Sequence, residues 1–188
     1  RQLGRDAAAF IEAMGIAPAN LVGTSDGGTA ALHLAIERPD LVSSVALLGT
    51  PFNTANYTPG AWRAIHRFLR PRSPALLFTR CLRRVLNPER GTWGVFYEMM
   101  KEMWLTLPDL TVEDLGRIRA PVLVVGCDRD EFLSGSDDPL RVFGQTARAI
   151  PGARLVVIEG GTHTVNLDMP AVTTDVILGF LRGLPARV

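Results

Sequence analysis

The chain is poor in several features that would assign it to a particular class of protein. Only two of its 188 residues, Cys81 and Cys127, are cysteines, which is too few for a disulfide framework, so we expect a reduced, cytoplasmic setting. No apolar run reaches about 18 residues, the length that a membrane-spanning helix needs. Twenty basic residues face nineteen acidic ones, and this balance argues against a protein that binds nucleic acid through charge.

Lysine is scarce as well, because Lys101 is the single lysine among the twenty basic residues. A chain rich in arginine, alanine and glycine hints at a bacterial genome of high GC content. It begins with Arg1 and has no signal-peptide pattern, so we expect its start to be internal, as in a processed product or a fragment. Hydrophobic residues make up 47% and charged residues 21% of the chain, which suits one globular domain with a sizeable core.

Helical and extended patterns alternate along most of the sequence. Apolar periodicity and turn residues predict strands at 20–23, 42–48, 121–125 and 154–158, and helices at 2–14, 29–36, 139–150 and 168–184. Such alternation is typical of parallel strands joined by helices. We therefore predict an α/β fold with a mostly parallel sheet flanked by helices.

Residues 53–110 interrupt this alternation. They carry nine basic and four acidic residues, and eight of the thirteen aromatic side chains. Their helical pattern is broken repeatedly by proline, which ends or begins helices. We predict that this segment is a helical insertion between the two parts of one core, residues 1–52 and 111–188.

The strongest motif is Gly-Thr-Ser-Asp-Gly-Gly at residues 23–28, which matches G-x-S-x-G between a predicted strand and a predicted helix. A sharp strand-to-helix turn would lift the hydroxyl of Ser25 out of the sheet. Small residues at Gly23 and Gly27 would let neighbouring backbone pass closely. The N-terminus of the following helix favours developing negative charge. Ser25 is therefore the candidate nucleophile; the alternative is an incidental serine in a glycine-rich turn.

A serine hydroxyl needs a base near neutral pH, and the chain has three histidines. His163 lies in a loop directly after the strand predicted at 154–158, at the end of a parallel sheet where α/β proteins build their sites. His33 falls within a buried helix and is more simply a core residue. His66 lies in the arginine-rich insertion. His163 is therefore the candidate base.

The base in turn needs a carboxylate that orients it. Asp128 and Asp130 both follow the strand predicted at 121–125. Asp130 lies further past the strand end and can reach over toward His163. Asp128 can instead cap the turn or pair with Arg129. We favour Asp130 and keep Asp128 as the alternative.

Together these segments resemble the α/β-hydrolases, from the first predicted helix to the last. The resemblance is carried by residues 21–28, 120–130 and 159–163, in the order nucleophile, acid, base. It implies that residues 53–110 are the cap or lid of the family. It also implies that the backbone N–H of Asp26 is one donor to the oxyanion. A serine at position 25 argues against haloalkane dehalogenases and epoxide hydrolases, which have aspartate there.

The sequence departs from the family at its start. Family members open with several strands, and one of their loops supplies a second oxyanion donor that nothing here matches. Losing one such donor costs ~10²–10³-fold in rate. The strand before Ser25 would also be left as an exposed apolar edge. We expect a longer natural protein, a homo-oligomer or partner segment that covers this edge, or a remnant chain.

Two further features concern the substrate. Phe96, Met100 and Trp104 are spaced four residues apart in a helical stripe that either packs the insertion on the core or lines a substrate pocket. The carboxylate of Asp26 would oppose an anionic substrate, although an acid at a helix N-terminus is also stabilised by the helix dipole. The many arginines of the insertion would instead attract an anion, so the charge of the substrate stays open.

These observations predict a serine hydrolase that acts on a small ester or related acyl substrate through an acyl-enzyme. The roles implied are Ser25 as nucleophile, His163 as base and Asp130 as acid, and no metal or organic cofactor is implied because the cysteines are too far apart for a ligand spacing. Carbon–carbon bond hydrolases, thioesterases and cofactor-free haloperoxidases share the same constellation. A hydrolase-like protein that only binds a ligand, or a truncated fragment, is the alternative from another class.

Overall fold

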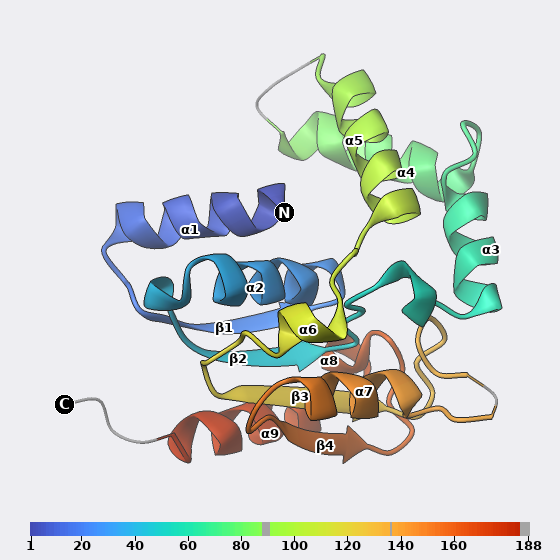
Figure 1. The fold of residues 1–188 in the computed structure, drawn as a ribbon. Coiled ribbons are helices and arrows are strands. Elements are labelled where there is room, and N and C mark those ends of the chain that lie inside the picture. The colour runs from blue at the N-terminus through green and yellow to red at the C-terminus, as the bar shows by residue number, and fades with distance from the viewer. Residues whose placement is uncertain (88–90, 136, 185–188) are drawn as a thin grey trace.

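Four parallel strands form the central sheet of the computed structural model, which describes residues 1–87, 91–135 and 137–184 (Figure 1). The strands are β1 (Ala19–Thr24), β2 (Val42–Leu48), β3 (Val122–Cys127) and β4 (Arg154–Ile158). They pair in this order, and every pair is parallel. β3 is buried along its whole length, as an apolar strand covered on both faces must be. The predicted α/β fold is confirmed.

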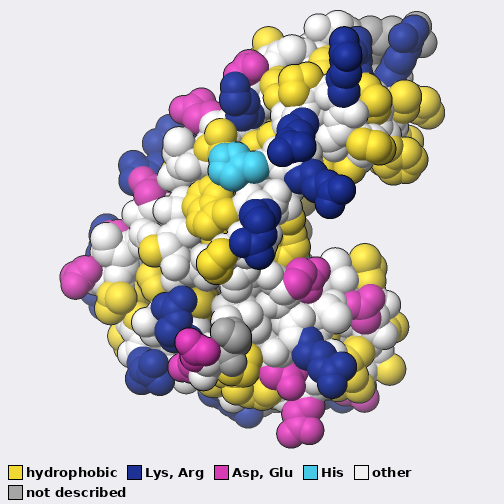
Figure 2. All heavy atoms as spheres, turned by 90° about the vertical axis from the view of Figure 1, so that its right-hand side faces the viewer, with side chains coloured by type: hydrophobic (Ala, Val, Ile, Leu, Met, Phe, Trp, Pro, Cys, Tyr) yellow, Lys and Arg dark blue, Asp and Glu magenta, His cyan; other side chains and the backbone are white. Residues whose placement is uncertain are grey.

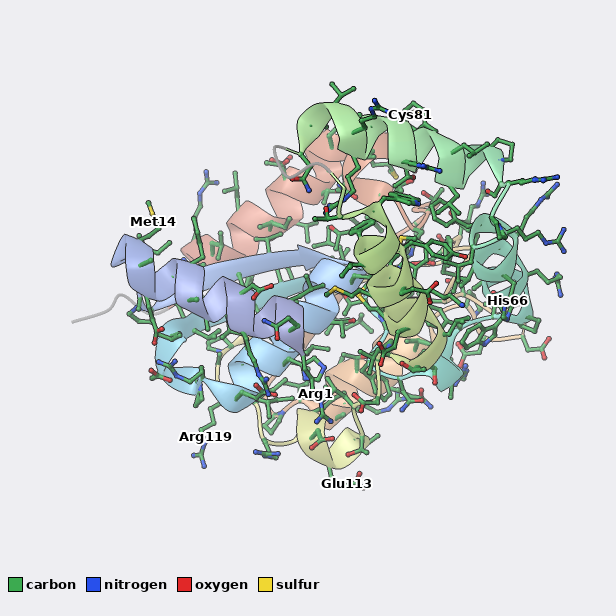
Figure 3. All side chains as sticks on the ribbon, turned by 90° about the horizontal axis from the view of Figure 1, so that it is seen from above. Arg1, Met14, His66, Cys81, Glu113 and Arg119 are labelled. Carbon is green, nitrogen blue, oxygen red and sulfur yellow. The ribbon has the colours of Figure 1, made fainter. Side chains whose placement is uncertain are left out.

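Helices cover both faces of the sheet. The core helices are α1 (Gln2–Met14), α2 (Asp26–Glu37), α6 (Val112–Leu115), α7 (Arg141–Ala149), α8 (Val165–Asp168) and α9 (Pro170–Arg182), with a 3₁₀ turn, η1 (Pro39–Leu41). α2 and α7 lie on one face and α9 lies on the other, while α1 packs against α2 (Figures 1 and 3). No helix among the described residues is long and apolar enough to cross a membrane.

The last helix, predicted over residues 168–184, is present as α9 (Pro170–Arg182) and begins two residues later than expected. The short helix α8 precedes it and ends at Asp168. Met169 between them is not helical, with φ −131° and ψ 56°. The ring of a proline disfavours the helical conformation of the residue before it, which is the reason for the break.

The cap segment, residues 53–110, lies beyond the carboxyl ends of the strands (Figure 1). It contains a 3₁₀ turn, η2 (Thr54–Asn56), and the helices α3 (Pro59–Phe68), α4 (Pro74–Leu86) and α5 (Trp93–Thr106). An antiparallel bridge between Asn53 and Asp109 joins its two ends. The cap has a small apolar core of its own, formed by Ile65, Leu69, Leu76 and Met100.

β1 lies at one edge of the described sheet and pairs with β2. Its Val22 side chain is 53% exposed, whereas Val45 on β2 is fully buried. The apolar edge expected from the sequence is therefore present in the structure. Ser25 follows directly after this edge strand.

Candidate active site

Ser25 occupies the sharp turn between β1 and α2. Its backbone has φ 52° and ψ −120°, in the region that favours glycine. Its N–H donates a hydrogen bond to the carbonyl of Leu48 at 2.9 Å, which anchors the turn to the neighbouring strand. A side chain held in this conformation costs on the order of 1–3 kcal/mol, so the surrounding packing must stabilise it.

Close packing at this turn comes from Gly23 and Gly28. A Cβ atom on Gly23 would lie 2.5 Å from the backbone of Gly28, and one on Gly28 would lie 1.9 Å from Thr50 Oγ1. By contrast, a Cβ on Gly27 would meet nothing within 4 Å. The prediction that Gly27 allows the close approach is therefore wrong. Gly27 is exposed at the start of α2, while Gly28 is buried.

One hydrogen-bonded chain links three of the predicted side chains. His163 Nε2 lies 3.0 Å from Ser25 Oγ. On the other side of the ring, His163 Nδ1 lies 3.1 Å and 3.0 Å from the two carboxylate oxygens of Asp130. The side chain of His163 is 13% exposed and that of Asp130 is fully buried. The structure thus brings together residues from three separate loops at the carboxyl ends of the strands.

Asp130 and Asp128 hold different parts of this site. Asp130 Oδ1 also accepts hydrogen bonds from the N–H groups of Phe132 and Leu133, at 2.9 Å and 3.0 Å, so its orientation is fixed. Asp128 Oδ1 accepts from the N–H of Gly160 at 2.6 Å. Asp128 therefore ties the β3 loop to the loop that carries the histidine, and Asp130 is the acid that contacts the imidazole.

The pKa of His163 is raised above its ordinary value of 6.5. Burial alone would lower it, but the hydrogen bond and the negative charge of Asp130, together with the charges of Glu131 and Asp26, outweigh burial. A carboxylate in this position favours the protonated imidazole, which is the form that a base reaches after it accepts a proton. The site is therefore suited to a base that becomes charged during a reaction.

Several residues next to the hydrogen-bonded side chains of Ser25, His163 and Asp130 were not anticipated from the sequence. Gly49 has φ 50°, and a Cβ there would lie 3.1 Å from both Asp130 Oδ2 and His163 Nδ1. Glu131 accepts the backbone N–H of His163 at 3.2 Å. The ring of Phe132 lies 4.5 Å from the imidazole, centroid to centroid. A glycine directly after a predicted strand was the only available signal for Gly49.

A cavity of about 300 Å³ opens beside Ser25. Its lining residues are Ser25, Asp26, Tyr57, Ala64, Ile65, Phe68, Trp104, Phe132 and His163. Four of these nine come from α3 and α5, so the cap forms one wall of the cavity. On the face shown in Figure 2, the surface is hollowed between the cap helices and the core.

Of the three stripe residues predicted to bind substrate, the structure brings Trp104 to this cavity. Met100 lies instead in the small core of the cap and is 7% exposed. Phe96 lies under the guanidinium of Arg83, whose carbon is 4.2 Å from the ring centroid. Neither Met100 nor Phe96 lines the cavity beside Ser25.

The other two histidines lie elsewhere. His33 is 3% exposed within α2, as its place in a buried helix predicted, and burial lowers its pKa. His66 is exposed on α3, at the outside of the cap (Figure 3). Among the described residues, no group of three or more His, Cys, Asp or Glu side chains is arranged to hold a metal ion.

Comparisons with known proteins agree with this fold. Residues 2–176 match the profile of the Alpha/beta hydrolase family. BpoC of Mycobacterium tuberculosis H37Rv, described as a proposed non-heme bromoperoxidase, is 28% identical over an alignment of 206 positions, which covers 96% of this chain and 74% of BpoC. RutD of Azorhizobium caulinodans, described as a proposed carbamate hydrolase, is 23% identical over an alignment of 198 positions, which covers 95% of this chain and 72% of RutD.

A solved structure shows the same likeness. The crystal structure of the enol-lactonase from Burkholderia xenovorans LB400 superposes with a TM-score of 0.68 and 23% identity. The match covers 96% of this chain and 72% of that one. At this level of identity, the likeness between the two structures is one of fold.

Proposed function

The chain belongs to the α/β-hydrolase family, and from that premise we propose that it is a serine hydrolase acting on a small ester or related acyl substrate. The observation that carries the proposal is the position of His163, within 3.0 Å of both Ser25 Oγ and a carboxylate oxygen of Asp130. A histidine held between a serine and a buried acid is the arrangement that activates a serine hydroxyl.

In the proposed reaction, Ser25 Oγ attacks the carbonyl carbon of the substrate while His163 Nε2 accepts the hydroxyl proton. Asp130 holds the proton on Nδ1 and stabilises the imidazolium that forms. The carbonyl oxygen becomes negative beside the N-terminus of α2, where the backbone N–H of Asp26 would donate to it.

The tetrahedral intermediate then collapses, and the bond to the leaving group breaks. His163 gives its proton to that group, which leaves an acyl ester on Ser25. Water enters next and loses a proton to His163 as it attacks the acyl carbon. The acid product departs, and the proton returns from the imidazole to Ser25 Oγ.

Size and wall chemistry support a small substrate with apolar parts. The cavity beside Ser25 measures about 300 Å³, and Ile65, Phe68 and Phe132 give it apolar walls. Such walls suit short acyl chains or rings. Because two relatives are named for carbamate and bromoperoxidase chemistry, a substrate panel should hold carbamates, and peroxide with bromide, beside simple esters.

A fluorophosphonate probe tests the proposal directly, because it reacts covalently with an activated serine. We expect intact-mass measurement to show one adduct on the parent chain and none on Ser25→Ala. His163→Ala should lose nearly all labelling. Ser43→Ala is the matched control, since Ser43 lies at the start of β2 in the same sheet, and it should label like the parent. A folded parent chain without an adduct contradicts the proposal and favours ligand binding without turnover. An adduct retained in Ser25→Ala also contradicts it, because the reactive nucleophile then lies elsewhere.

A further inference from the structure

The cavity beside Ser25 contains one carboxylate and, besides His163, no basic side chain. Among the nine residues that line it, Asp26 supplies a carboxylate, and none is lysine or arginine. Asp26 directly follows the candidate nucleophile, so its charge lies close to any acyl group bound to Ser25. The negative charge on this wall therefore acts directly on a bound substrate.

The carboxylate of Asp26 is held by a residue of the cap. Trp104 Nε1 on α5 donates a hydrogen bond to Asp26 Oδ2 at 2.8 Å. The Trp104 ring is itself fixed by an edge-on contact with Phe68, whose centroid is 5.1 Å away. An indole N–H supplies a hydrogen bond but no positive charge. The contact thus orients the carboxylate toward the cavity wall and leaves its negative charge uncompensated by this partner.

The field of Asp26 reaches other residues of the cavity. Burial, and then the negative charge of Asp26, raise the pKa of Tyr57. The same charge is one of those that oppose the effect of burial on the pKa of His163. Tyr57 and His163 both line the cavity, so a charged group on a bound substrate would experience this field as well.

The arginines of the cap do not offset this charge within the cavity. Arg63, Arg67 and Arg70 are exposed, and basic side chains gather on the outer surface of the cap in Figure 2. Exposed charges are screened over about 8 Å at physiological ionic strength, whereas partly buried ones are screened less. Asp130 and Glu131 act more strongly than Asp26 on His163, but neither lines the cavity, so the partly buried Asp26 is the carboxylate that a bound acyl group meets on the cavity wall.

We propose that Asp26 determines the charge selectivity of this site: acyl groups that are neutral or cationic are accepted, and acyl groups bearing a second carboxylate are rejected. The inference rests on the proposed function, because it takes the cavity beside Ser25 as the acyl site. Two like charges about 6 Å apart, at an effective dielectric constant near 40, repel strongly enough to change binding roughly tenfold.

Three p-nitrophenyl esters of one chain length test this selectivity. They carry hexanoate, which is neutral, the monoester of adipate, which is anionic, and 6-trimethylammoniohexanoate, which is cationic. In the parent chain we expect kcat/KM to be lowest for the adipate ester. Asp26→Asn keeps the size of the side chain and an acceptor for Trp104. It should raise the adipate-to-hexanoate ratio about tenfold and lower the cation-to-hexanoate ratio by a similar factor.

Two control variants separate this charge from other effects. Glu113→Gln removes one exposed negative charge on α6 (Figure 3) and should leave both ratios unchanged. Trp104→Phe removes the N–H donor and keeps the carboxylate, so it should preserve the discrimination against adipate. Equal ratios in Asp26→Asn and the parent chain, or discrimination lost in Trp104→Phe alone, would overturn the inference.

A binding measurement distinguishes failure of this inference from failure of the proposed function. Calorimetry with hexanamide, the monoamide of adipate and 6-trimethylammoniohexanamide requires no turnover and keeps the charge at the far end of the chain. We expect the adipate monoamide to bind the parent chain most weakly and to gain about tenfold in Asp26→Asn. If no ester is turned over but this order holds, the proposed function fails, and the charge selectivity of Asp26 stands for ligand binding alone. If esters are turned over without charge preference, or if binding shows no such order, the inference fails.

Discussion

Two adjacent glycines at the start of α2 should respond in opposite directions to the same substitution. Gly27 is exposed, and a Cβ atom there would meet nothing within 4 Å. Its backbone lies in the helical region, which alanine adopts readily. Gly27→Ala should therefore raise the free energy of unfolding by about 0.4–1 kcal/mol, mainly because the unfolded chain loses conformational freedom.

Gly28→Ala should destabilise the fold, because the added Cβ overlaps Thr50. It would lie 1.9 Å from Thr50 Oγ1, 2.7 Å from Cγ2 and 2.8 Å from Cβ. Rotation about χ1 moves the first two atoms but not the third, so α2 must shift away from the end of β2. Overpacking of this kind typically costs about 1–3 kcal/mol. Because Ser25 immediately precedes α2, the shift should also lower kcat/KM.

Urea denaturation of both variants, with ester hydrolysis measured on the same samples, checks the reasoning. We expect the denaturation midpoint to rise for Gly27→Ala and to fall for Gly28→Ala. Adding Thr50→Ala to Gly28→Ala removes two of the three overlapping atoms and should recover part of the lost stability. Midpoints that move in the same direction, or a Gly28→Ala variant as stable as the parent chain, would refute this account of the turn.

Two further predictions concern His163 and η2. Because Asp130 holds the pKa of His163 above 6.5, kcat/KM should fall as the pH drops through that raised pKa, and NMR titration of the imidazole should give a lower midpoint in Asp130→Asn. Equal NMR midpoints in the two proteins would contradict this effect of Asp130. Because the fold favours the protonated imidazole, the stability that His163 contributes is fully present below pH 6.5 and is lost as the pH rises through its folded pKa. The side chain of Asn56 accepts the N–H groups of Phe52 and Asn53 at 2.9 Å and 2.8 Å, so Asn56→Ala should cost about 1–3 kcal/mol in chemical denaturation. Fluorophosphonate labelling should persist in that variant, and an unchanged midpoint would speak against the role of Asn56.

Core elements with an unambiguous apolar pattern could be predicted from the sequence. β2 was expected at residues 42–48, and the structure has it at Val42–Leu48, because a strand buried on both faces reads as a continuous apolar run. The position of Ser25 at a sharp turn could also be predicted, since such a turn needs small neighbouring residues in a fixed local pattern. The choice between Gly27 and Gly28 could not be made, because it depends on which side of α2 faces Thr50.

The cap shows why a helical pattern did not predict the walls of the cavity. Phe96, Met100 and Trp104 follow one stripe of α5, yet their first and last positions are about 12 Å apart along the helix axis. A cavity of about 300 Å³ contacts only one end of such a stripe. Trp104 lies at that end, Met100 packs within the cap and Phe96 meets Arg83.

The contacts of Asp26 could not be predicted either, because its partner lies far away in the sequence. In its own sequence window, it looks like an acid placed favourably at a helix N-terminus, and the structure does place it in the first turn of α2. Its hydrogen bond to Trp104 joins residues 78 positions apart, and no local pattern can reveal such a pair. Its position in the cavity wall depends on where the cap is seated. The sharp turn at Ser25 therefore follows from a local pattern, whereas the place of Asp26 in the cavity wall depends on tertiary structure.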